Sequence, residues 1–301
     1  RNRVNAPAAI KAENHHPTPA ERLWALAAED MAAVDALILE RMDSPIGLIP
    51  DLAQHLVGAG GKRLRPLLTV ASARLCGYGG CEQYKLAAAV EFIHSATLLH
   101  DDVVDESALR RGKKPANLIW GNSASILVGD FLFARAFNLM VEAGSMEALG
   151  ILSNASSVIA EGEVQQLAAL RDVKMSETAY MQVISAKTAA LFAAAAEVSP
   201  VLAGCDDSKQ NALRQYGQEL GLAFQLVDDA LDYGGFEVSL GKSVGDDFRE
   251  GKMTLPVILA YQDAKSRGDE TALTFWHKVI VAHKQDSGDL ATATQYLQDA
   301  D

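Results

Sequence analysis

The chain has 301 residues, 49% hydrophobic composition and a formal net charge of −12 at pH 7. This length is sufficient for one large core or two small ones. The acidic balance argues against a general nucleic-acid binder, which needs a basic surface. An anionic substrate would therefore have to be held by local cations or by a metal ion.

The first residues, 1–19, are polar, contain three prolines and lack the apolar core of a signal sequence. They predict a flexible N-terminal arm, followed by one domain over residues 20–301. Cys76, Cys81 and Cys205 lack metal-ligand spacing and are odd in number, which is typical of a reducing compartment such as the cytoplasm. No stretch of 18 or more uncharged apolar residues is present, so no transmembrane helix is predicted.

Helical periodicity runs through most of the chain. Apolar residues recur at helical spacing from 20 to 42, and residues 49–57 predict a second, short helix. Longer helices, rich in Ala and Leu and without the alternation of strands, are expected at 66–76, 84–100, 122–141, 147–170, 176–198 and 217–233. Ser176 and Glu177 give a capping signal, and the end of the chain from Asp263 on is expected to be ordinary surface helix. The predicted class is all-α.

A glycine-rich loop at 58–61 precedes three cations, Lys62, Arg63 and Arg65. Glycine lets backbone amides approach an oxyanion closely, and arginine can donate two hydrogen bonds to one phosphate group. The loop is therefore a candidate anion site. A solvated basic turn explains the same residues.

Asp101, Asp102 and Asp105 follow the long apolar helix expected at 84–100. A helix advances about 100° per residue, so Asp101 and Asp105 share a face and Asp102 lies beside them. Like charges at this spacing repel, which favours a nearby positive charge. Mg²⁺ prefers one or two carboxylates and completes its shell with water and phosphate oxygens. The triplet therefore predicts a platform for metal and phosphate.

Two simpler explanations apply to this triplet. Acidic residues often crowd the first turn of a helix because the macrodipole favours them there. The apolar pattern runs into the triplet from its N-terminal side, however, so the aspartates should lie late in their helix. Arg110 and Arg111 follow closely and could simply neutralise the aspartates.

Asp228, Asp229 and Asp232 repeat the same spacing in the second half of the chain. Two helices that face each other in a bundle would place both triplets around shared metal ions. A loop over residues 234–245 follows, with Lys242 inside it and Lys252 shortly after it. This segment is either a lid whose lysines reach a bound phosphate or a plain solvated loop.

Four motifs in this order resemble those of the trans-isoprenyl diphosphate synthases, the polyprenyl synthetase family. They are GGKRLRP at 60–66, DDVVD at 101–105 with its Arg-Arg-Gly, FQLVDDALD at 224–232 and GDDFREGKMTLP at 245–256. The resemblance implies an all-α helical bundle around a central cavity, a homodimer, and Mg²⁺, with three ions expected, between the two aspartate helices. It also implies repeated condensation of isopentenyl diphosphate onto an allylic diphosphate, farnesyl or geranylgeranyl.

The resemblance also implies roles by motif position. Direct Mg²⁺ ligands would be Asp101, Asp105 and Asp228, with Asp102, Asp229, Asp232 and Asp246 as outer partners. The allylic diphosphate would be held by Arg110, Lys187, Lys242 and Lys252, and isopentenyl diphosphate by Lys62, Arg65, His94 and Arg111. Thr188 and Gln225 would lie near the reacting carbons. Without the resemblance, His94 would more simply be a core histidine.

Product length is expected to depend on the helix before Asp101, since one turn of about 5.4 Å is close to one isoprene unit. Ala96 and Thr97 lie one turn before Asp101 and are small, so growth should continue past them to a floor at Phe133 or Phe137. The runs at 92–107 and 161–167 look most like bacterial octaprenyl to decaprenyl diphosphate synthases, which make the side chains of quinones such as ubiquinone.

Four alternatives remain beside this interpretation. A shorter-chain geranylgeranyl synthase would share the chemistry. A terpene cyclase usually lacks the second aspartate triplet and the isopentenyl site, and a non-catalytic regulatory subunit typically loses one triplet. A helical interaction protein would show no Mg²⁺-dependent binding of diphosphate. Peripheral membrane contact for product release is compatible with each synthase interpretation.

Overall fold

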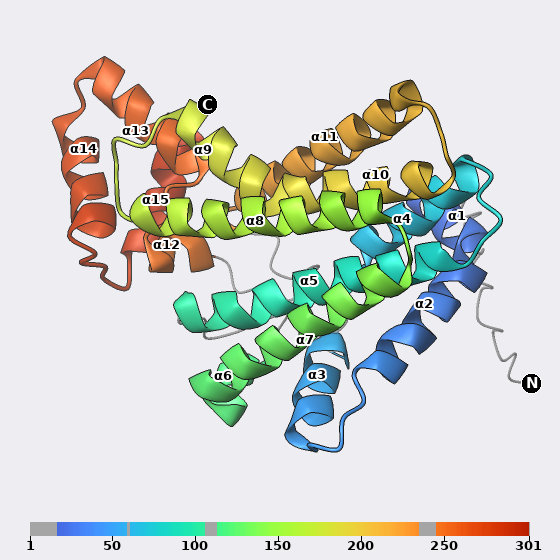
Figure 1. Ribbon diagram of the computed structural model, residues 1–301. Coiled ribbons are helices and arrows are strands. Elements are labelled where there is room, and N and C mark those ends of the chain that lie inside the picture. The colour runs from blue at the N-terminus through green and yellow to red at the C-terminus, as the bar shows by residue number, and fades with distance from the viewer. Residues whose placement is uncertain (1–16, 59–60, 106–112, 235–244, 301) are drawn as a thin grey trace, which may run out of the picture.

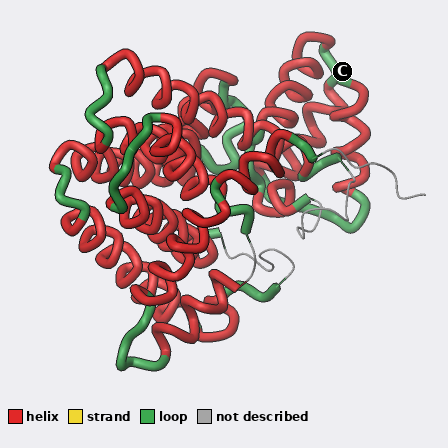
Figure 2. Tube along the Cα trace, turned by 90° about the vertical axis from the view of Figure 1, so that its right-hand side faces the viewer, coloured by secondary structure: helices red, strands yellow, loops and turns green. Residues whose placement is uncertain are grey.

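The computed structural model describes residues 17–58, 61–105, 113–234 and 245–300. Over these residues the chain consists of helices and connecting loops without a β-strand (Figure 2), which confirms the all-α prediction. The expected N-terminal arm lies largely outside the described residues. The elements, labelled in Figure 1, are α1 (Pro19–Leu26), α2 (Ala28–Arg41), α3 (Leu48–Gly58), α4 (Leu64–Leu75), α5 (Glu82–Val104), α6 (Ala116–Trp120), α7 (Asn122–Glu142), α8 (Met146–Ala168), α9 (Glu177–Ile184), η1 (Ser185–Ala189), α10 (Ala190–Leu202), α11 (Asp207–Leu231), α12 (Asp246–Glu250), α13 (Leu255–Arg267), α14 (Glu270–Trp276), η2 (His277–Val281) and α15 (Asp289–Asp299).

Most predicted helices are present, and three differ from the prediction in an informative way. The helix expected at 20–42 is two helices, because the backbone at Ala27 leaves the helical region with φ −99° and ψ 7°. The run at 176–198 does begin at the Ser176 cap, whose hydroxyl accepts from the Ala179 amide at 3.1 Å, but π-helical η1 interrupts it. The helix α11 begins at Asp207 rather than Gly217, capped by the Asp206 carboxylate.

Helix α5 lies at the centre of the larger hydrophobic cluster. Its alanines 87–89 and its side chains Phe92 and Ile93 are fully enclosed, and α7, α4, α2 and α10 pack around it. In Figure 1, α8, α10 and α11 run alongside one another on one side of α5 and α7. The charged end of α5 is thus carried by a helix whose remaining length is fixed by the core.

Glycines and hydroxyls hold the helices of this layer close together. A Cβ at Gly217 would lie 2.4 Å from the Phe192 carbonyl oxygen, and one at Gly221 would lie 2.6 Å from Cα of Ala189, so both positions need glycine for α11 to pack on η1 and α10. The Thr69 hydroxyl on α4 donates to the Ala195 carbonyl of α10 at 2.8 Å. These contacts fix how far apart α4, α10 and α11 can lie.

The C-terminal segment forms a second, smaller hydrophobic cluster. Trp276, Val279, Ile280 and Ala293 are fully buried, together with Phe248 from α12. The helices expected from Asp263 on are present, and their inward faces contribute to this cluster. In the C-terminal helices the charged residues are spaced so that one apolar face points inward, and that face packs against α9, α11 and α12.

Two described helical runs, Asn122–Glu142 and Glu177–Leu202, are long and apolar enough to cross a membrane by length and composition alone. Neither run is an uncharged segment, because Asp130 and Arg135 lie within the first and Lys187 and Glu197 within the second. Core helices of folded domains pass the same test, and 61% of the apolar window in the second run is buried within the protein.

Candidate functional site

The first aspartate triplet lies at the C-terminal end of α5. Asp101 and Asp102 belong to its last turn, and Asp105 is the C-cap. The macrodipole disfavours carboxylates at this end of a helix, so it cannot account for them. The predicted position, late in an apolar helix, is confirmed, and the triplet needs cations from elsewhere in the chain.

One such cation is Lys187, in the π-helical turn η1. Its ammonium donates to Glu163 Oε2 at 2.9 Å and to Gln166 Oε1 at 2.8 Å, both on α8, and lies 3.4 Å from Asp101 Oδ2. Burial alone would lower the pKa of Lys187, but attraction by Asp101 and Glu163 outweighs it and the pKa is raised. Lys187 therefore remains charged beside Asp101.

The second cation is Lys252, which follows α12. Its ammonium donates to Asp105 Oδ2 at 2.9 Å and is also ion-paired with Glu250. Burial opposes the charge here too, yet Asp105 and Glu250 raise the pKa of Lys252. Asp101 and Asp105, the first and last members of the triplet, thus each face one lysine, although 147 residues separate Asp105 from Lys252 in sequence.

The π-helical turn explains how Lys187 reaches the site. A π turn inserts one extra residue into a helix and reorients the side chains there, and such turns recur at functional sites. The backbone of α8 approaches closely, since a Cβ at Gly162 would lie 2.8 Å from the Ala186 Cβ and 3.0 Å from the Lys187 amide nitrogen. On another side of the turn, Gln218 Nε2 donates to the Ser185 hydroxyl at 2.7 Å. The sequence run at 176–198 gives no sign of this turn.

Lys252 is positioned by an unusual backbone arrangement. Gly251, immediately before it, has φ 74° and ends α12. Side chains of His283 and Gln285 each donate to a main-chain carbonyl near the end of α12, at 2.7 Å in both cases. His283 at φ 49° and Arg171 at φ 64°, two of the three described non-glycine residues with positive φ, both pack beside Gly251. Sparsely populated backbone conformations of this kind gather at functional sites.

The second triplet, at the end of α11, has different surroundings. Asp229 accepts from the Tyr180 hydroxyl at 2.6 Å and from Gln225 Nε2 at 2.7 Å. Gln225 Oε1 in turn accepts from the Thr188 hydroxyl at 2.6 Å. The structure thus joins Thr188, Gln225 and Asp229, three residues predicted for the site, while Asp228 is half-buried on the same helix.

Asp232 performs a local structural task. Its carboxylate accepts from the amide nitrogens of Asp246 at 3.3 Å and Asp247 at 3.0 Å, and its carbonyl accepts from the Gly245 amide at 2.9 Å. These are the otherwise unpaired amides that begin α12. Asp232 therefore connects the end of α11 to the segment that carries Lys252.

Asp102 points away from solvent and is fully enclosed, and its carbonyl accepts from Asn117 Nδ2 at 3.1 Å. Next to the triplet, His100 Nε2 donates to the Ile126 carbonyl of α7 at 3.1 Å and lies 3.5 Å from Asp130 Oδ1. A Cβ at Gly129 would lie 2.3 Å from that imidazole nitrogen. His100 and Gly129 fix the charged end of α5 against α7, and neither was among the predicted site residues; the isolated glycine in an apolar helix was the only available sign.

Three of the residues expected to bind isopentenyl diphosphate, Lys62, Arg65 and His94, lie among the described residues. Lys62 is exposed, whereas the Arg65 guanidinium lies 4.3 Å over the Phe192 ring. Arg63, with φ 40°, begins α4 and turns its side chain to Asp35 on α2, with Nη1 3.1 Å from Oδ1. His94 is half-buried on α5. Three predicted residues lie outside the described residues: Arg110, Arg111 and Lys242.

The positions proposed to set product length lie along α5. Ala96 is fully enclosed, and Thr97 is half-buried with its hydroxyl on the His94 carbonyl at 2.7 Å. Phe133 and Phe137 of α7, the expected floor, stack with ring centroids 5.8 Å apart. Of the two gate positions, Thr97 is the one with a side chain that is not fully surrounded.

The fit of these residues to a metal follows from their chemistry. Within the described residues, no three His, Cys, Asp or Glu side chains form a metal-sized cluster. Mg²⁺ needs few protein carboxylates, because it fills its shell with water and substrate phosphate oxygens. Asp101, Asp105 and Asp228 supply hard oxygen donors of the required kind, and lysines lie beside the first two. The shared metal site between the triplets stays a prediction.

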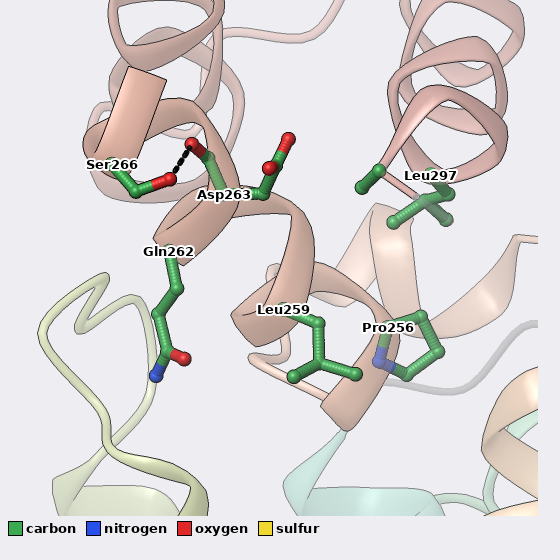
Figure 3. Close-up of a pocket in the computed structure, with 7 residues that line it drawn as sticks. Pro256, Leu259, Gln262, Asp263, Ser266 and Leu297 are labelled. Carbon is green, nitrogen blue, oxygen red and sulfur yellow. Dashed lines mark hydrogen bonds between the residues drawn. The ribbon is translucent and has the colours of Figure 1, made fainter. Parts of the chain in front are cut away.

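A pocket of about 450 Å³ lies elsewhere, on the surface of α13 and α15 (Figure 3). Its lining residues are Pro256, Leu259, Gln262, Asp263, Ser266, Leu297 and Ala300. No aspartate of either triplet and no predicted lysine lines it, so it does not belong to the candidate site.

Comparison with known proteins shows the family of the chain. Residues 47–297 match the Polyprenyl synthetase family. Octaprenyl diphosphate synthase of Escherichia coli is 52% identical over 240 residues, covering 80% of this chain and 74% of that protein. A decaprenyl diphosphate synthase of Rhodobacter capsulatus is similar in structure, with a TM-score of 0.87, 54% identity and coverage of 94% of this chain and 86% of that one.

A polyprenyl synthase of Caulobacter crescentus, solved with calcium and isoprenyl diphosphate, is also similar, with a TM-score of 0.89 and 57% identity over 93% of this chain and 84% of that one. The all-α bundle agrees with these similarities. The chain is a prenyltransferase and belongs to the polyprenyl synthetase family.

Proposed function

We propose that this protein is a Mg²⁺-dependent trans-polyprenyl diphosphate synthase, which adds isopentenyl diphosphate repeatedly to an allylic diphosphate. The observation that carries the proposal is the pairing of Lys187 with Asp101 and of Lys252 with Asp105. Segments far apart in sequence converge there to hold ammonium groups next to carboxylates. That arrangement suits a diphosphate that arrives with bound metal and leaves with increased negative charge.

In this mechanism Lys187 and Lys252 turn from the aspartates to oxygens of the allylic diphosphate. Mg²⁺ held by Asp101, Asp105 and Asp228 would supply charge neutralisation of the leaving group. The allylic carbon then ionises, and the isopentenyl double bond attacks it. A proton is lost, with the released diphosphate as the base. Because the cations are held in place before reaction, they stabilise developing charge without reorganisation.

Thr188 of η1 and Gln225 of α11 would present their side-chain oxygens to the reacting carbons. Their hydrogen bond, at 2.6 Å, fixes both dipoles before substrate binds. Oxygen dipoles held in this way can stabilise a positive carbon electrostatically. Lys62, Arg65 and His94 would hold the diphosphate of the second substrate, isopentenyl diphosphate.

We further propose a long-chain product that serves as a quinone side chain, such as that of ubiquinone. Small residues at Ala96 and Thr97 support this product length, as do relatives named octaprenyl, nonaprenyl and decaprenyl synthases. A geranylgeranyl diphosphate synthase of Saccharolobus solfataricus is 40% identical over 217 residues, so a shorter product is the second candidate. Both triplets are present, and Lys187 and Lys252 lie beside the first, which argues against a non-catalytic regulatory subunit.

The proposal includes a homodimer formed through α7 and a cytoplasmic location. Helix α7 exposes an apolar face with Ile126, Leu127, Phe137 and Val141, and Leu127 and Val141 are each 65% exposed. A symmetric partner would bury such a face. The three cysteines are unpaired, as expected in a reducing compartment. Light scattering of wild type and of Leu127→Glu tests the dimer: the variant should be monomeric, and a wild-type monomer would contradict it.

The function is tested by incubating the protein with labelled isopentenyl diphosphate, farnesyl diphosphate and Mg²⁺, and resolving the dephosphorylated products by length. We expect a ladder that ends at about eight to ten isoprene units, the lengths in the names of the relatives, and no product with EDTA. A ladder that ends at four units would contradict the long-chain proposal. Substrate binding without condensation would contradict the synthase itself.

A further inference from the structure

A chain of three side-chain hydrogen bonds runs from the buried phenol of Tyr180 to the site. The Tyr180 hydroxyl, on α9, donates to Asp229 Oδ2, Gln225 Nε2 donates to Asp229 Oδ1, and Thr188 donates to Gln225 Oε1, at 2.6, 2.7 and 2.6 Å. Tyr180, Asp229 and Thr188 are only 3%, 4% and 5% exposed. The first member of this chain, Tyr180, has no role in the mechanism described above.

The direction of the hydrogen bonds follows from Asp229. An ionised carboxylate only accepts, so both Tyr180 and the amide nitrogen of Gln225 must donate to it. The amide oxygen of Gln225 then has to face Thr188, whose single hydroxyl hydrogen is used in return. Asp229 thereby fixes the orientation of two groups that the proposed function places near the reacting carbons.

Both oxygens of Asp229 are occupied by donors from the protein. Removing the Tyr180 hydroxyl would leave a carboxylate oxygen with one donor fewer, in a place almost closed to water, which is unfavourable for a buried charged group. The carboxylate would turn to find another donor and release Gln225. The pKa of Tyr180 is raised by burial and by Asp229, so its hydroxyl keeps the proton it donates.

We propose that Tyr180 is a positioning residue for the condensation, which holds Asp229 so that Gln225 and Thr188 present their oxygens in a fixed orientation. This role rests on the proposed function. The ring of Tyr180 packs in the smaller hydrophobic cluster, whereas the hydroxyl alone reaches Asp229. Tyr180→Phe therefore separates packing from positioning.

The test measures kcat and both KM values for wild type and Tyr180→Phe. Removal of an outer partner of a site residue typically costs about 10- to 100-fold in activity. We expect Tyr180→Phe to lose about tenfold in kcat with KM for either diphosphate unchanged. Tyr261→Phe is the matched control, because it removes a tyrosine hydroxyl that contacts His277 beside the same cluster, at 3.2 Å, and it should keep wild-type kcat.

A double-mutant cycle with Thr188→Val sharpens the test. If the hydrogen bonds act as one chain, adding Tyr180→Phe to Thr188→Val should cost little further kcat. Additive losses would overturn the proposal, and so would wild-type kcat in Tyr180→Phe or a loss confined to KM. Should Tyr180→Phe fail to fold, Asp229→Asn takes its place, with an expected loss of about 10- to 100-fold in kcat. A wild-type protein that condenses nothing would overturn the proposed function and this role together.

Discussion

The two aspartate triplets share one spacing, i, i+1 and i+4, and both end a long helix, yet their partners differ. Around the first triplet, Asp101 and Asp105 face the ammonium groups of Lys187 and Lys252. Around the second, Asp229 accepts from neutral side chains and Asp232 accepts from backbone amides. The same sequence pattern therefore gives carboxylates that are ion-paired with lysines at the end of α5. At the end of α11 it gives carboxylates that are held by hydrogen bonds from neutral side chains and backbone amides.

This difference follows from what each partner can do when an anion arrives. An ammonium group can move from a carboxylate to a phosphate oxygen, and the carboxylate it leaves becomes available to a cation. Backbone amides that begin α12 and a buried phenol have no such alternative. We infer that Asp228, half-buried and next to these supports, is the member of the second triplet that contacts metal.

The largest effect is expected from the first triplet. Asp101→Asn or Asp105→Asn should reduce kcat/KM by about 10²- to 10³-fold, because a preorganised charge at the reacting group is lost. Steady-state condensation measures this loss, with thermal unfolding to verify the fold. Either variant at more than half of wild-type activity would remove the distinction between the triplets.

The second triplet should divide into unequal members. Asp228→Asn should cost about as much as the first triplet, 10²- to 10³-fold in kcat/KM. Asp229→Asn should cost about 10- to 100-fold, since it supports other groups. Both variants replace neighbouring carboxylates by the same amide, so each is the control of the other. Equal losses in the two variants would contradict the assignment.

A smaller effect is expected at Asp232, which caps the first amides of α12. Asp232→Ala should lower the free energy of unfolding by about 1 kcal/mol, the usual cost of a lost cap. Its activity should fall as well, because α12 holds the segment of Lys252. Asp206→Ala is the matched control, since Asp206 caps α11 at 2.9 Å from the Lys209 amide, far from Lys252 in the chain.

Calorimetric unfolding and condensation assays on these two variants test the role of Asp232. Similar losses of stability with reduced activity only in Asp232→Ala would support a structural link to Lys252. Unchanged stability in Asp232→Ala would show that its carboxylate is free for another role, such as metal binding.

The smallest effect concerns Glu163, which shares Lys187 with Asp101. Burial raises the pKa of Glu163 and Asp101 adds to this, while Lys187 lowers it; the pKa stays above its ordinary value of 4.5. When the pKa of a carboxyl group is raised in the folded state, the folded protein loses stability as pH rises through that pKa. Relative to Glu163→Gln, wild type should therefore become less stable with rising pH.

Melting temperatures of substrate-free wild type and Glu163→Gln at about pH 5 and about pH 8 measure this effect. The advantage of Glu163→Gln should be larger at the higher pH. A constant difference between the two proteins would show that burial beside the first triplet does not disfavour the ionised form of Glu163.

Periodicity and motif spacing were sufficient for most of the helices and for the place of the first aspartate triplet within its helix. The position of Asp101 at the end of an apolar helix follows from the sequence alone, because the hydrophobic pattern approaches it from one side. Membership of the family followed from four motifs in order, and comparison confirmed it. These features depend on local spacing, which a sequence displays directly.

What the sequence could not reveal depends on contacts between distant segments. The π turn at Lys187 lies where α8 and α11 both pack against the same helical run, and no residue type within 185–189 indicates it. The left-handed backbone at Arg63, Arg171 and His283 is equally hidden, since none of them is glycine. The roles of Tyr180 and His100 also depend on partners more than twenty residues away.

The most direct test of the different tasks of the triplets is Mn²⁺ binding in the presence of inorganic diphosphate, followed by electron paramagnetic resonance. Wild type, Asp101→Asn, Asp228→Asn and Asp229→Asn are compared under one condition. We predict that Asp101→Asn and Asp228→Asn each lose bound Mn²⁺, whereas Asp229→Asn keeps the wild-type number of ions. Loss of an ion in Asp229→Asn, with full binding in Asp228→Asn, would contradict the account.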